Sequence, residues 1–436
     1  MCGGGTVSTL PDQVTIEPLA ALAGLADLPG DKSVSHRALL LSAYSEGTST
    51  ITGLSSGDDV MATATIVGQL GADLHVDGTT VTVVGGRSRL RPSPTALDCG
   101  NSGTGIRLLM GFVAGIPGHH VLVGDVSLSS RPMDRVATPL RLMGASVDGI
   151  GDRVCAPISI DGGPLRGIEY HVPVASAQVK SAILLAALWA EGPTTVVEGV
   201  ATRPNTEEMI AQAGGSVEVE HSDERSAITV RPGRLDAVDW QVPSDPSQAA
   251  FFVVAGLLAG AGELSCRNLY GDATRVGFLT VLERMGGAVS RRHEPTGLLD
   301  VSSSSSSLHG TLVQASEIPS LDEVPILAVA AAAASGTTRF VDVAELRIKE
   351  SDRFARTIDL VCRLGAAASA EGDDLVIHGL GTASRFNSFS FDAEHDHRMA
   401  MSAAIAGLVG AGATISGFAT VASSFPSFLD VVAAIS

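Results

Sequence analysis

The sequence predicts an α/β protein built from six βαβαββ repeats, three in each of two domains. An Ala/Leu-rich helical run, followed by a Gly and a short β-like run, occurs six times. The Gly markers after these helical runs are 70 to 76 residues apart, and five of the repeats share a second Gly-containing tag. Self-similarity at a fixed period is the signature of a repeat architecture.

The first helix of each repeat is almost wholly apolar, which favours a buried position inside its domain. The helical runs with their following strands span residues 36–54, 105–125, 179–200, 248–269, 324–343 and 397–418, and their markers are Gly47, Gly118, Gly192, Gly262, Gly336 and Gly412.

A second helix follows, and in the first five repeats it ends on the tag QLGADL, LMGASV, QAGGSV, RMGGAV or RLGAAA. Gly suits a helix C-terminus because the left-handed conformation costs little without a Cβ. Alternating residues around a polar turn come next, as in LHVDGTTVTVVGG, and predict a hairpin of two strands.

The sixth repeat ends with a helix at FPSFLDVVAAIS and lacks this hairpin, and we expect the unassigned N-terminal run QVTIEPL to supply a strand there. The first domain would span residues 29–241. The second, discontinuous domain would contain residues 1–28 and 242–436, with the active site in the cleft between the two. Pro stands at both crossings together with Gly or Ser, as is common in hinges.

The charge and composition exclude several classes of protein. The chain has 29 Lys and Arg against 47 Asp and Glu, a net charge of −18, so it is a poor general binder of nucleic acid or anionic membrane. Its longest apolar run, about residues 249–262, is too short to cross a bilayer, and no apolar signal core stands at the N-terminus. Five scattered cysteines without a CxxC pair argue against disulfides or structural zinc. We therefore expect a cytoplasmic protein.

Lysine is nearly absent from the basic residues. Only Lys32, Lys180 and Lys349 are lysines, and the other basic residues are Arg. Arg replaces Lys at most solvated positions but not where a compact, titratable ammonium is needed. The three lysines are therefore candidates for specific roles.

Polar segments precede all six first helices: PGDKSVSHR, CGNSGTGIR, VASAQVKS, PSDPSQAA, IPSLDEVP and EHDHRMAM. Each could serve only as a helix cap, since Ser, Asn and Asp accept hydrogen bonds from the first free N–H groups. Three parallel helix starts per domain would also gather partial positive charge and N–H donors, which bind phosphate or carboxylate. The repeats thus predict an anion-binding cleft in an acidic protein.

Cations concentrate in and near these segments. They are Lys32, Arg37, Arg107, Arg131, Lys180, Arg203, Arg347, Lys349, Arg353 and Arg398. Arg binds phosphate and carboxylate through two parallel hydrogen bonds, so the set indicates a ligand with more than one anionic group. Asp322 and Glu350 lie among these cations, and an acid that stays ionised beside cations suits a general base. Glu350 could equally be only an ion-pair partner of Lys349 or Arg353.

The sequence has no nucleophile elbow, P-loop or dinucleotide fingerprint. His395 and His397 could suggest a metal, but no further ligand cluster supports one. We expect acid–base and electrostatic catalysis on phosphorylated substrates, with no cofactor and no metal.

Motifs along nearly the whole chain resemble those of the 5-enolpyruvylshikimate-3-phosphate synthase family. They are LPGDKSVSHRALLL, GNSGTGIRLLMG, SSRPM, SAQVKSAILLA, DEVPILAVAAA, ELRIKESDR, DHRMAM and SSFPSF, in the family's order. The resemblance implies the two-domain inside-out α/β barrel of the enolpyruvyl transferases. It also implies transfer of the enolpyruvyl group of phosphoenolpyruvate to the 5-hydroxyl of shikimate 3-phosphate, in the shikimate pathway, with release of phosphate.

The resemblance also implies site residues. Those that match the shikimate 3-phosphate site are Lys32, Ser33, Arg37, Ser176, Ala177, Gln178, Arg203, Asp322 and Lys349. Those that match the phosphoenolpyruvate site are Lys32, Gly103, Arg131, Gln178, Arg353 and Arg398. Among the catalytic groups, Asp322 matches the base for the 5-hydroxyl proton and Glu350 the group that protonates the methylene carbon, and Lys32 assists addition and elimination.

Three positions depart from parts of the family. Leu108 and Ser423 stand where one branch has Pro and Lys, and Asn205 stands where many members have His. The first two resemble the branch that is often tolerant of glyphosate, although Gly103 is retained. Tolerance is a hypothesis that micromolar inhibition at saturating shikimate 3-phosphate would contradict.

Two alternatives compete with this assignment. The sister enzyme UDP-N-acetylglucosamine enolpyruvyl transferase would need a reactive Cys in GDVSLSSRP, where Ser127, Leu128 and Ser129 stand instead. The other is a non-catalytic paralogue that binds a phosphorylated ligand. Four intact residues argue against it: Lys32, Asp322, Lys349 and Glu350. We expect a monomer, because the fold needs no partner.

Overall fold

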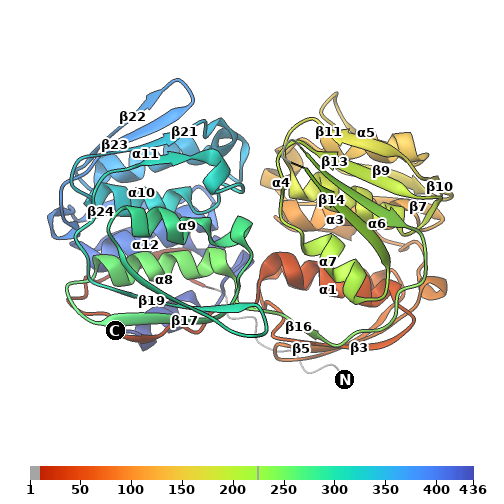
Figure 1. The fold of residues 1–436 in the computed structure, drawn as a ribbon, viewed down its shortest axis with the longest axis horizontal. Helices are drawn as coiled ribbons and strands as arrows, with labels where there is room; N and C mark the ends of the chain where they lie inside the picture. The colour runs from red at the N-terminus through yellow and green to blue at the C-terminus, as the bar shows by residue number, and fades with distance from the viewer. Residues whose placement is uncertain (1–9, 223–224) are drawn as a thin grey trace. The chain divides into compact units, whose positions relative to one another are not determined.

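The computed structural model describes residues 10–222 and 225–436, and the chain divides into two compact units (Figure 1). One unit is Gly30–Val242, and the other joins the N-terminal segment up to Pro29 with Pro243–Ser436. Each division falls one residue after the boundary expected from the sequence. We call them the 30–242 unit and the discontinuous unit.

The helices of the 30–242 unit are α1 Lys32–Tyr44, α2 Asp58–Gln69, α3 Gly103–Ala114, α4 Val126–Ser130, α5 Asp134–Met143, α6 Ala177–Ala187 and α7 Asn205–Gln212, with the 3₁₀ turn η1 Arg87–Arg89. Its strands are β3 Gly47–Thr52, β4 Asp73–Asp77, β5 Thr80–Gly85, β6 Leu97–Asp98, β7 Gly118–Val123, β8 Ser146–Ile150, β9 Cys155–Gly162, β10 Leu165–Arg166, β11 Glu169–Val172, β12 Ala190–Glu191, β13 Thr194–Glu198, β14 Ser216–His221, β15 Ser226–Arg231 and β16 Trp240–Gln241.

The helices of the discontinuous unit are α8 Pro246–Leu258, α9 Ala273–Arg284, α10 Val324–Ala333, α11 Arg353–Arg363, α12 His397–Val409 and α13 Phe428–Ala434, with 3₁₀ turns η2 Ala315–Glu317, η3 Ala344–Ile348, η4 Ala383–Arg385 and η5 Phe418–Ser423. Its strands are β1 Gln13–Ile16, β2 Gly24–Leu25, β17 Glu263–Tyr270, β18 Ala288–His293, β19 Leu298–Ser304, β20 Leu312–Gln314, β21 Thr337–Val341, β22 Ala367–Glu371, β23 Asp374–His378, β24 Phe389–Asp392 and β25 Ala413–Ser416.

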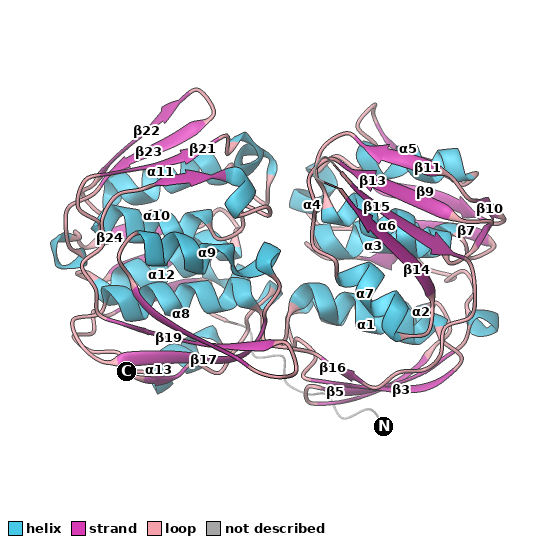
Figure 2. Ribbon diagram, viewed as in Figure 1, coloured by secondary structure: helices cyan, strands magenta, loops and turns pink. Residues whose placement is uncertain are grey.

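The predicted repeat is confirmed by the sheet topology (Figure 2). Over the described residues, each complete repeat gives a sheet in which a parallel pair of strands is extended by an antiparallel hairpin. The orders are β16-β3-β5-β4, β6-β7-β9-β8 and β11-β13-β15-β14 in the 30–242 unit, and β2-β17-β19-β18 and β20-β21-β23-β22 in the discontinuous unit. In the β6-β7, β11-β13 and β20-β21 pairs, the first helix of the repeat connects the two parallel strands, as a parallel crossover requires.

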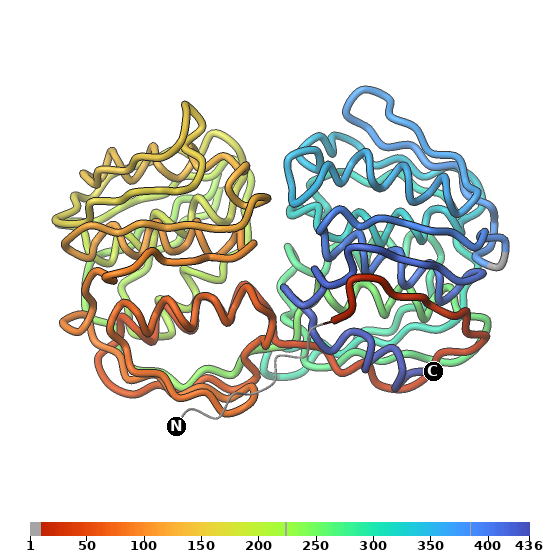
Figure 3. The backbone as a smooth tube through the Cα atoms, turned by 180° about the vertical axis from the view of Figure 1, so that it is seen from behind, coloured from red at the N-terminus to blue at the C-terminus, as the bar shows by residue number. Residues whose placement is uncertain are grey.

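The sixth repeat is completed from the other end of the chain, as the sequence predicts. Strand β1 pairs antiparallel with β25, with Gln13 opposite Ser416 and Ile16 opposite Ala413. Strand β24 pairs with β25 in parallel on its other side. Figure 3 shows the N-terminal segment running beside the C-terminal elements of the same unit.

Two short strands at the crossings belong to sheets that sequence order does not suggest. Strand β2 precedes α1 in sequence, but it pairs with β17 of the discontinuous unit. Strand β16 precedes α8, but it pairs with β3 of the 30–242 unit. Each unit thus completes one sheet with a strand that lies just before a crossing to the other unit.

The apolar first helices lie inside and the sheets lie outside, so the prediction of buried helices is confirmed. In the 30–242 unit α3 and α6 pack against each other, and α1 contributes Leu39, Leu40 and Leu41 to the same core. In the discontinuous unit α10 is buried along its whole length and packs against α8 and α12. Burial of apolar side chains provides the main driving force for such a core.

The Gly markers turn the chain from each first helix into the following strand. All six have positive φ angles, between 88° and 124°. Residues with a Cβ rarely adopt this conformation, so Gly is the residue that permits the turn. The regularly spaced glycines in the sequence therefore mark the same backbone turn in every repeat.

Candidate active site

The three core helices of the 30–242 unit begin with side-chain caps. Asp31 accepts a hydrogen bond from the N–H of Val34 at 2.8 Å, and Ser102 accepts one from Gly105 at 2.9 Å. Ser176 caps α6 in the same way, with a longer contact of 3.4 Å to Val179. Capping therefore accounts for Asp31 and Ser102, whereas Ser176, with its longer cap contact, remains a ligand-binding candidate together with the residues that follow the caps.

Lys32 lies at the first position of α1. Its Nζ is 2.9 Å from Asp59 Oδ2 in the first turn of α2. The lysine side chain is 15% exposed, whereas that of Asp59 is 7% exposed. The ion pair thus holds the ammonium at the helix start, within reach of a ligand.

Arg37 is buried one turn further along α1. Its Nε donates to Thr206 Oγ1 at 2.6 Å, and its guanidinium also donates to Ser181 Oγ at 2.6 Å and to the carbonyl of Ser33 at 2.8 Å. Arg37 therefore joins α1, α6 and α7, a structural contribution that the sequence motif did not reveal.

Arg203 reaches the same helix start from the loop before α7. Its guanidinium lies 3.4 Å from Ser33 Oγ, and both side chains are largely buried. Gln178, in the first turn of α6, donates to Thr104 Oγ1 of α3 at 3.4 Å. Arg203 thus contacts the start of α1, and the starts of α6 and α3 contact each other.

Two arginines meet at the start of α3. The guanidinium of Arg131 donates to Asn101 Oδ1 at 2.8 Å, and that of Arg107 donates to the carbonyl of Gly103 at 2.7 Å. A Cβ added at Gly103 would lie 2.7 Å from an Arg131 guanidinium nitrogen and 3.0 Å from one of Arg107. Gly103 therefore leaves the space that lets both cations approach the helix N-terminus.

His36 of α1 is fully buried close to the helix starts described above. Its Nδ1 is 2.8 Å from Thr63 Oγ1, and its Nε2 is 3.4 Å from the capping Ser102 Oγ. Burial lowers its pKa well below the ordinary value, and the nearby Lys32 and Arg37 lower the pKa further. A neutral imidazole is thus part of the support for the helix starts.

In the discontinuous unit, Arg353 occupies the centre of a carboxylate cluster. Its guanidinium is 2.7 Å from Asp396 Oδ2, 3.1 Å from Asp322 Oδ1 and 2.5 Å from Glu350 Oε2. Burial alone would lower its pKa, but these carboxylates outweigh burial and raise the pKa above the ordinary value. The fully buried arginine is therefore charged at every physiological pH.

Asp322 lies between two arginines. Besides its contact with Arg353, its Oδ2 is 3.5 Å from Arg398, which also donates to the Asp322 carbonyl at 3.4 Å. The preceding Leu321 has a φ angle of 56°, a conformation that residues with a side chain seldom adopt. The Asp322 side chain is 19% exposed, so a substrate hydroxyl can reach its carboxylate.

Lys349 is the lysine of this cluster. Its Nζ donates to the carbonyl of Ser320 at 3.1 Å. Burial lowers its pKa and Arg353 lowers it further, while Asp322 and Glu350 act in the opposite direction. An ammonium with a lowered pKa loses a proton more easily than an ordinary lysine, which suits proton transfer.

Asp396 and Glu323 are two site residues that the sequence reasoning did not assign. Asp396 caps α12 through the N–H groups of Arg398 and Met399 and also orients Arg353. Glu323 accepts from Ser320 Oγ at 3.1 Å, next to the carbonyl that holds Lys349. Asp396 lies in the motif of Arg398, and Glu323 lies in the motif of Asp322. Their closeness in sequence to these candidates could therefore have indicated that they belong to the site.

The predicted site residues thus gather in two groups, one in each unit. The group of the 30–242 unit is Lys32, Ser33, Arg37, Gly103, Arg131, Ser176, Ala177, Gln178 and Arg203. The group of the discontinuous unit is Asp322, Lys349, Glu350, Arg353 and Arg398. Lys180 Nζ instead contacts Glu198, the Thr202 carbonyl and Glu207 inside the 30–242 unit. Within the described ranges no group of three or more His, Cys, Asp or Glu has the arrangement of a metal site, and no helix is long and apolar enough to cross a membrane.

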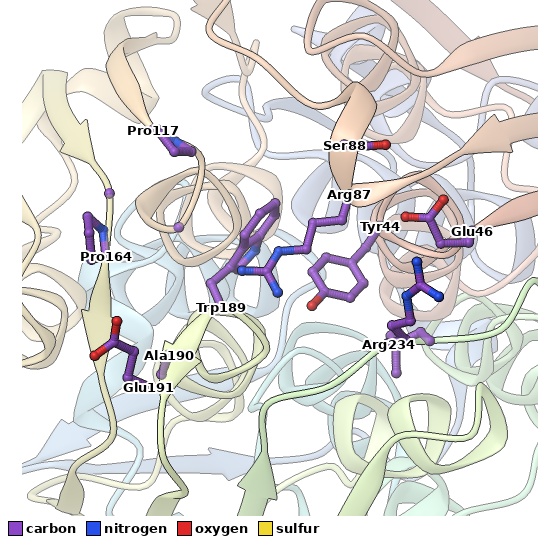
Figure 4. A pocket seen from close by; sticks show the side chains of 13 residues that line it. Tyr44, Glu46, Arg87, Ser88, Pro117, Pro164, Trp189, Ala190, Glu191 and Arg234 are labelled. Carbon is purple, nitrogen blue, oxygen red and sulfur yellow. The ribbon is translucent and has the colours of Figure 1, made fainter.

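A hollow of about 670 Å³ lies at the opposite ends of the same helices (Figure 4). Tyr44, Trp189 and Gly115 line it where α1, α6 and α3 end, and Arg87 stacks over the Trp189 ring at 4.7 Å. The charged side chains around it are exposed to solvent. Because the predicted chemistry lies at the helix starts, we assign this hollow no part in it.

The fold is that of the enolpyruvyl transferases. The solved enolpyruvyl transferase NikO from Streptomyces tendae superposes with a TM-score of 0.75 over 97% of this chain and 96% of its own, and at 17% identity this likeness establishes the fold. A profile of EPSP synthase (3-phosphoshikimate 1-carboxyvinyltransferase) matches residues 16–432. The chain belongs to the EPSP synthase family.

Individual relatives agree with this membership. The chain is 44% identical over 408 residues to the 3-phosphoshikimate 1-carboxyvinyltransferase of Desulforudis audaxviator, covering 92% of this chain and 94% of the relative. It is 42% identical over 429 residues to that of a Roseiflexus species, covering 96% and 98%. The EPSP synthase structure from Acinetobacter baumannii matches with a TM-score of 0.84 at 38% identity, covering 97% and 98%.

Proposed function

We propose that this chain transfers the enolpyruvyl group of phosphoenolpyruvate to the 5-hydroxyl of shikimate 3-phosphate and releases phosphate, a step of the shikimate pathway towards chorismate. The observation that carries the proposal is the cluster of Asp322, Lys349 and Glu350 around the buried Arg353, in a chain of the EPSP synthase family. Such a cluster offers acids, a base and cations for anionic substrates without a covalent nucleophile.

Shikimate 3-phosphate is assigned to the residues that meet around Ser33. Arg203 and Lys32 would neutralise the phosphate, while Ser33, Ser176, Ala177 and Gln178 would orient it by hydrogen bonds from side chains and helix N–H groups. Arg37 lies deeper in the unit, where its guanidinium donates a hydrogen bond to the Ser33 carbonyl and so supports Ser33. Asp322 and Lys349 are assigned to the 5-hydroxyl of the same substrate.

Phosphoenolpyruvate is assigned to a second group of cations. Arg131 beside Gly103 would bind one anionic group, while Arg353 and Arg398 would bind another, with Lys32 and Gln178 shared between the two substrates. Arginine forks match both carboxylate and phosphate geometry. The proposal requires both groups of residues to act on the same pair of substrates.

The proposed chemistry has two stages. In the addition, Asp322 takes the 5-hydroxyl proton, the hydroxyl oxygen attacks the central carbon of phosphoenolpyruvate, and Glu350, which must be protonated in the substrate complex, gives its proton to the methylene carbon. In the elimination, the Glu350 carboxylate takes a proton back from the new methyl group, the carbon–oxygen bond to phosphate breaks and the double bond is restored, and the departing phosphate carries away the proton held by Asp322. Lys32 assists both stages by stabilising the charge on the phosphate.

The test is phosphate release from phosphoenolpyruvate by the purified chain. We expect release that depends on shikimate 3-phosphate, and we expect Asp322→Asn and Glu350→Gln each to reduce kcat by 100-fold or more, in the range of about 10² to 10⁴ for general acid–base groups. Release only with a UDP-sugar acceptor would support the sister enzyme, and binding without release would support a non-catalytic paralogue.

We also propose that the chain acts in the cytoplasm as a monomer, with these two small anions as its partners. Light scattering coupled to size-exclusion chromatography should give a mass near 44.5 kDa with and without ligands. A dimer mass at micromolar protein concentration would contradict the monomer.

A further inference from the structure

The loop that carries Arg203 is fastened by one buried lysine. Strand β13 ends at Glu198 and helix α7 begins at Asn205, so residues 199–204 form the connection. Lys180 Nζ is 3.0 Å from Glu198 Oε2 before the loop, 3.1 Å from the Thr202 carbonyl within it, and 2.7 Å from Glu207 Oε1 after it. A single ammonium therefore holds both ends and the middle of this loop.

The fastening is deeply buried. The side chains of Lys180, Glu198 and Glu207 are 1%, 2% and 7% exposed. Three N–H donors and three acceptors satisfy the ammonium completely, and Glu198 also accepts from the Thr202 hydroxyl. A buried ion cluster is weak evidence for stability, because a well-packed apolar cluster is often as stable. A geometric role explains better why charges occupy this position.

The geometry that depends on this cluster is that of Arg203. Arg203 directly follows Thr202, whose carbonyl and hydroxyl are both engaged by the cluster. From there its guanidinium extends to Ser33 Oγ at the start of α1. On the other side of the loop, Thr206 donates to Ser181, the residue after Lys180. Helix α6 thus contacts the Thr202 backbone before Arg203 and the side chains of Thr206 and Glu207 after it.

We propose that Lys180 is a positioning residue for Arg203, which makes it a determinant of affinity for the shikimate phosphate group. The inference rests on the proposed function, in which Arg203 binds that phosphate. A lysine suits this position because its compact ammonium directs three tetrahedrally arranged donors to the three acceptors, whereas the donors of an arginine guanidinium all lie in one plane.

Removal of Lys180 would also change the electrostatics around Arg203. The carboxylates of Glu198 and Glu207 would lose the cation between them, and a buried carboxylate without a cation is costly. Arg203 is the neighbouring cation on the same loop, so the carboxylates would draw its guanidinium inward. Both the released loop and this attraction move Arg203 away from a bound phosphate.

The experiment is a double-mutant cycle on the full chain, with the dissociation constant of shikimate 3-phosphate measured by calorimetry. We expect Lys180→Met to weaken binding by about tenfold, since small displacements of a binding group have effects of this size or larger. In an Arg203→Ala background, the same change should weaken binding by less than about twofold, because the group it positions is absent. The KM for phosphoenolpyruvate should change little in Lys180→Met.

Two further variants keep the test decisive if Lys180→Met folds poorly. Glu198→Gln keeps a side chain of the same size that can still accept a hydrogen bond, but it removes the negative charge. It should weaken binding of shikimate 3-phosphate by less than Lys180→Met does, and this effect should also disappear in the Arg203→Ala background. Leu184→Ala, on the same helix and in the core, is the control: it lowers stability and should leave the dissociation constant unchanged.

The outcomes separate two failures. Equal losses from Lys180→Met with and without Arg203, or a loss matched by Leu184→Ala, would overturn the positioning role. An unchanged dissociation constant in both Lys180→Met and Glu198→Gln would overturn it as well. If the wild-type chain neither binds shikimate 3-phosphate nor uses it as acceptor, the proposed function itself fails.

Discussion

Arg353 is surrounded by anions before any substrate arrives. Its guanidinium contacts Asp322, Glu350 and Asp396, and burial leaves it no direct exposure to water. A bound anion must therefore share this arginine with Asp322 and Glu350, the acids that we propose to be catalytic. Binding would weaken the hold of Arg353 on Glu350 and Asp322, which would couple substrate arrival to the state of both acids.

Lys349 provides a prediction about protons. Because burial and Arg353 lower its pKa, part of the free enzyme carries a neutral Lys349 at alkaline pH, and a bound anion should raise the pKa again. Binding of shikimate 3-phosphate at about pH 9 should therefore take up protons. Calorimetry in buffers of different ionisation enthalpy measures this uptake, and Lys349→Met should abolish it. Equal uptake in the variant would assign the proton to another group.

Gly103 provides a prediction about space. In Gly103→Ala the new methyl group would lie 2.7 Å from Arg131, so the guanidinium must move. An arginine end is flexible, and we expect a stability loss below about 1 kcal/mol, with a rise in KM for phosphoenolpyruvate of about tenfold. The control is Gly163→Ala, which meets no atom within 4 Å. A normal KM in Gly103→Ala would show that Arg131 does not bind this substrate.

At the scale of single residues, the motifs predicted candidate site residues but not the side chains that contact them. Lys180 was conspicuous in the sequence only because lysine is rare. Its carboxylates, Glu198 and Glu207, lie 18 and 27 residues away in sequence, in no motif that marks them. Side-chain contacts across such distances depend on how repeats pack, which the periodicity of one repeat does not specify.

Among the elements, helices α1, α2 and α3 are connected by a neutral histidine. His36 on α1 contacts Thr63 of α2 and the capping Ser102 of α3, and its pKa is lowered mainly by burial. The unfolded chain therefore binds a proton below about pH 6.5 that the folded chain does not bind. This contribution to stability is present above that pH and is lost as the pH falls.

Urea unfolding at several pH values tests this dependence. From about pH 6.5 downwards, His36 should contribute a loss of up to about 1.4 kcal/mol per pH unit in the free energy of unfolding. His36→Gln should lack that slope, although it is less stable at neutral pH. The control is His171→Gln at an exposed site, which should keep the wild-type slope. A wild-type slope in His36→Gln would contradict the assignment.

The elements themselves were largely predictable because their signals are local. Apolar helical runs, Gly turns and alternating hairpins each occupy a few adjacent residues, and repetition made them unmistakable. The strands β2 and β16 escaped prediction, since each has only two paired residues and no alternating pattern. Their sheet partners lie more than 180 residues away in sequence and follow from the path of the chain between units.

At the scale of the whole molecule, the two units should differ in their capacity to fold alone. Residues 30–242 contain all strands of their described sheets, including β16, so this fragment should unfold cooperatively by itself. Residues 243–436 lack β1 and β2, which leaves edges of β25 and β17 unpaired. We expect this fragment to aggregate or to unfold without cooperativity.

Adding residues 10–29 to the second fragment is the matched experiment. Joined by a flexible linker to the N-terminus of residues 243–436, they should restore a cooperative thermal transition measured by circular dichroism. An equally cooperative transition without residues 10–29 would show that β1 and β2 are dispensable for this unit.

The pairing of β1 with β25 has a consequence for synthesis on the ribosome. The 30–242 unit can fold as soon as β16 has emerged, whereas β1 waits for a partner made about 400 residues later. At a synthesis rate of about 5 to 20 residues per second, this interval is about 20 to 80 s. Throughout that time Val14 and Ile16 have no strand to cover them, so the newly made N-terminus is a natural client for a chaperone that shields short apolar segments.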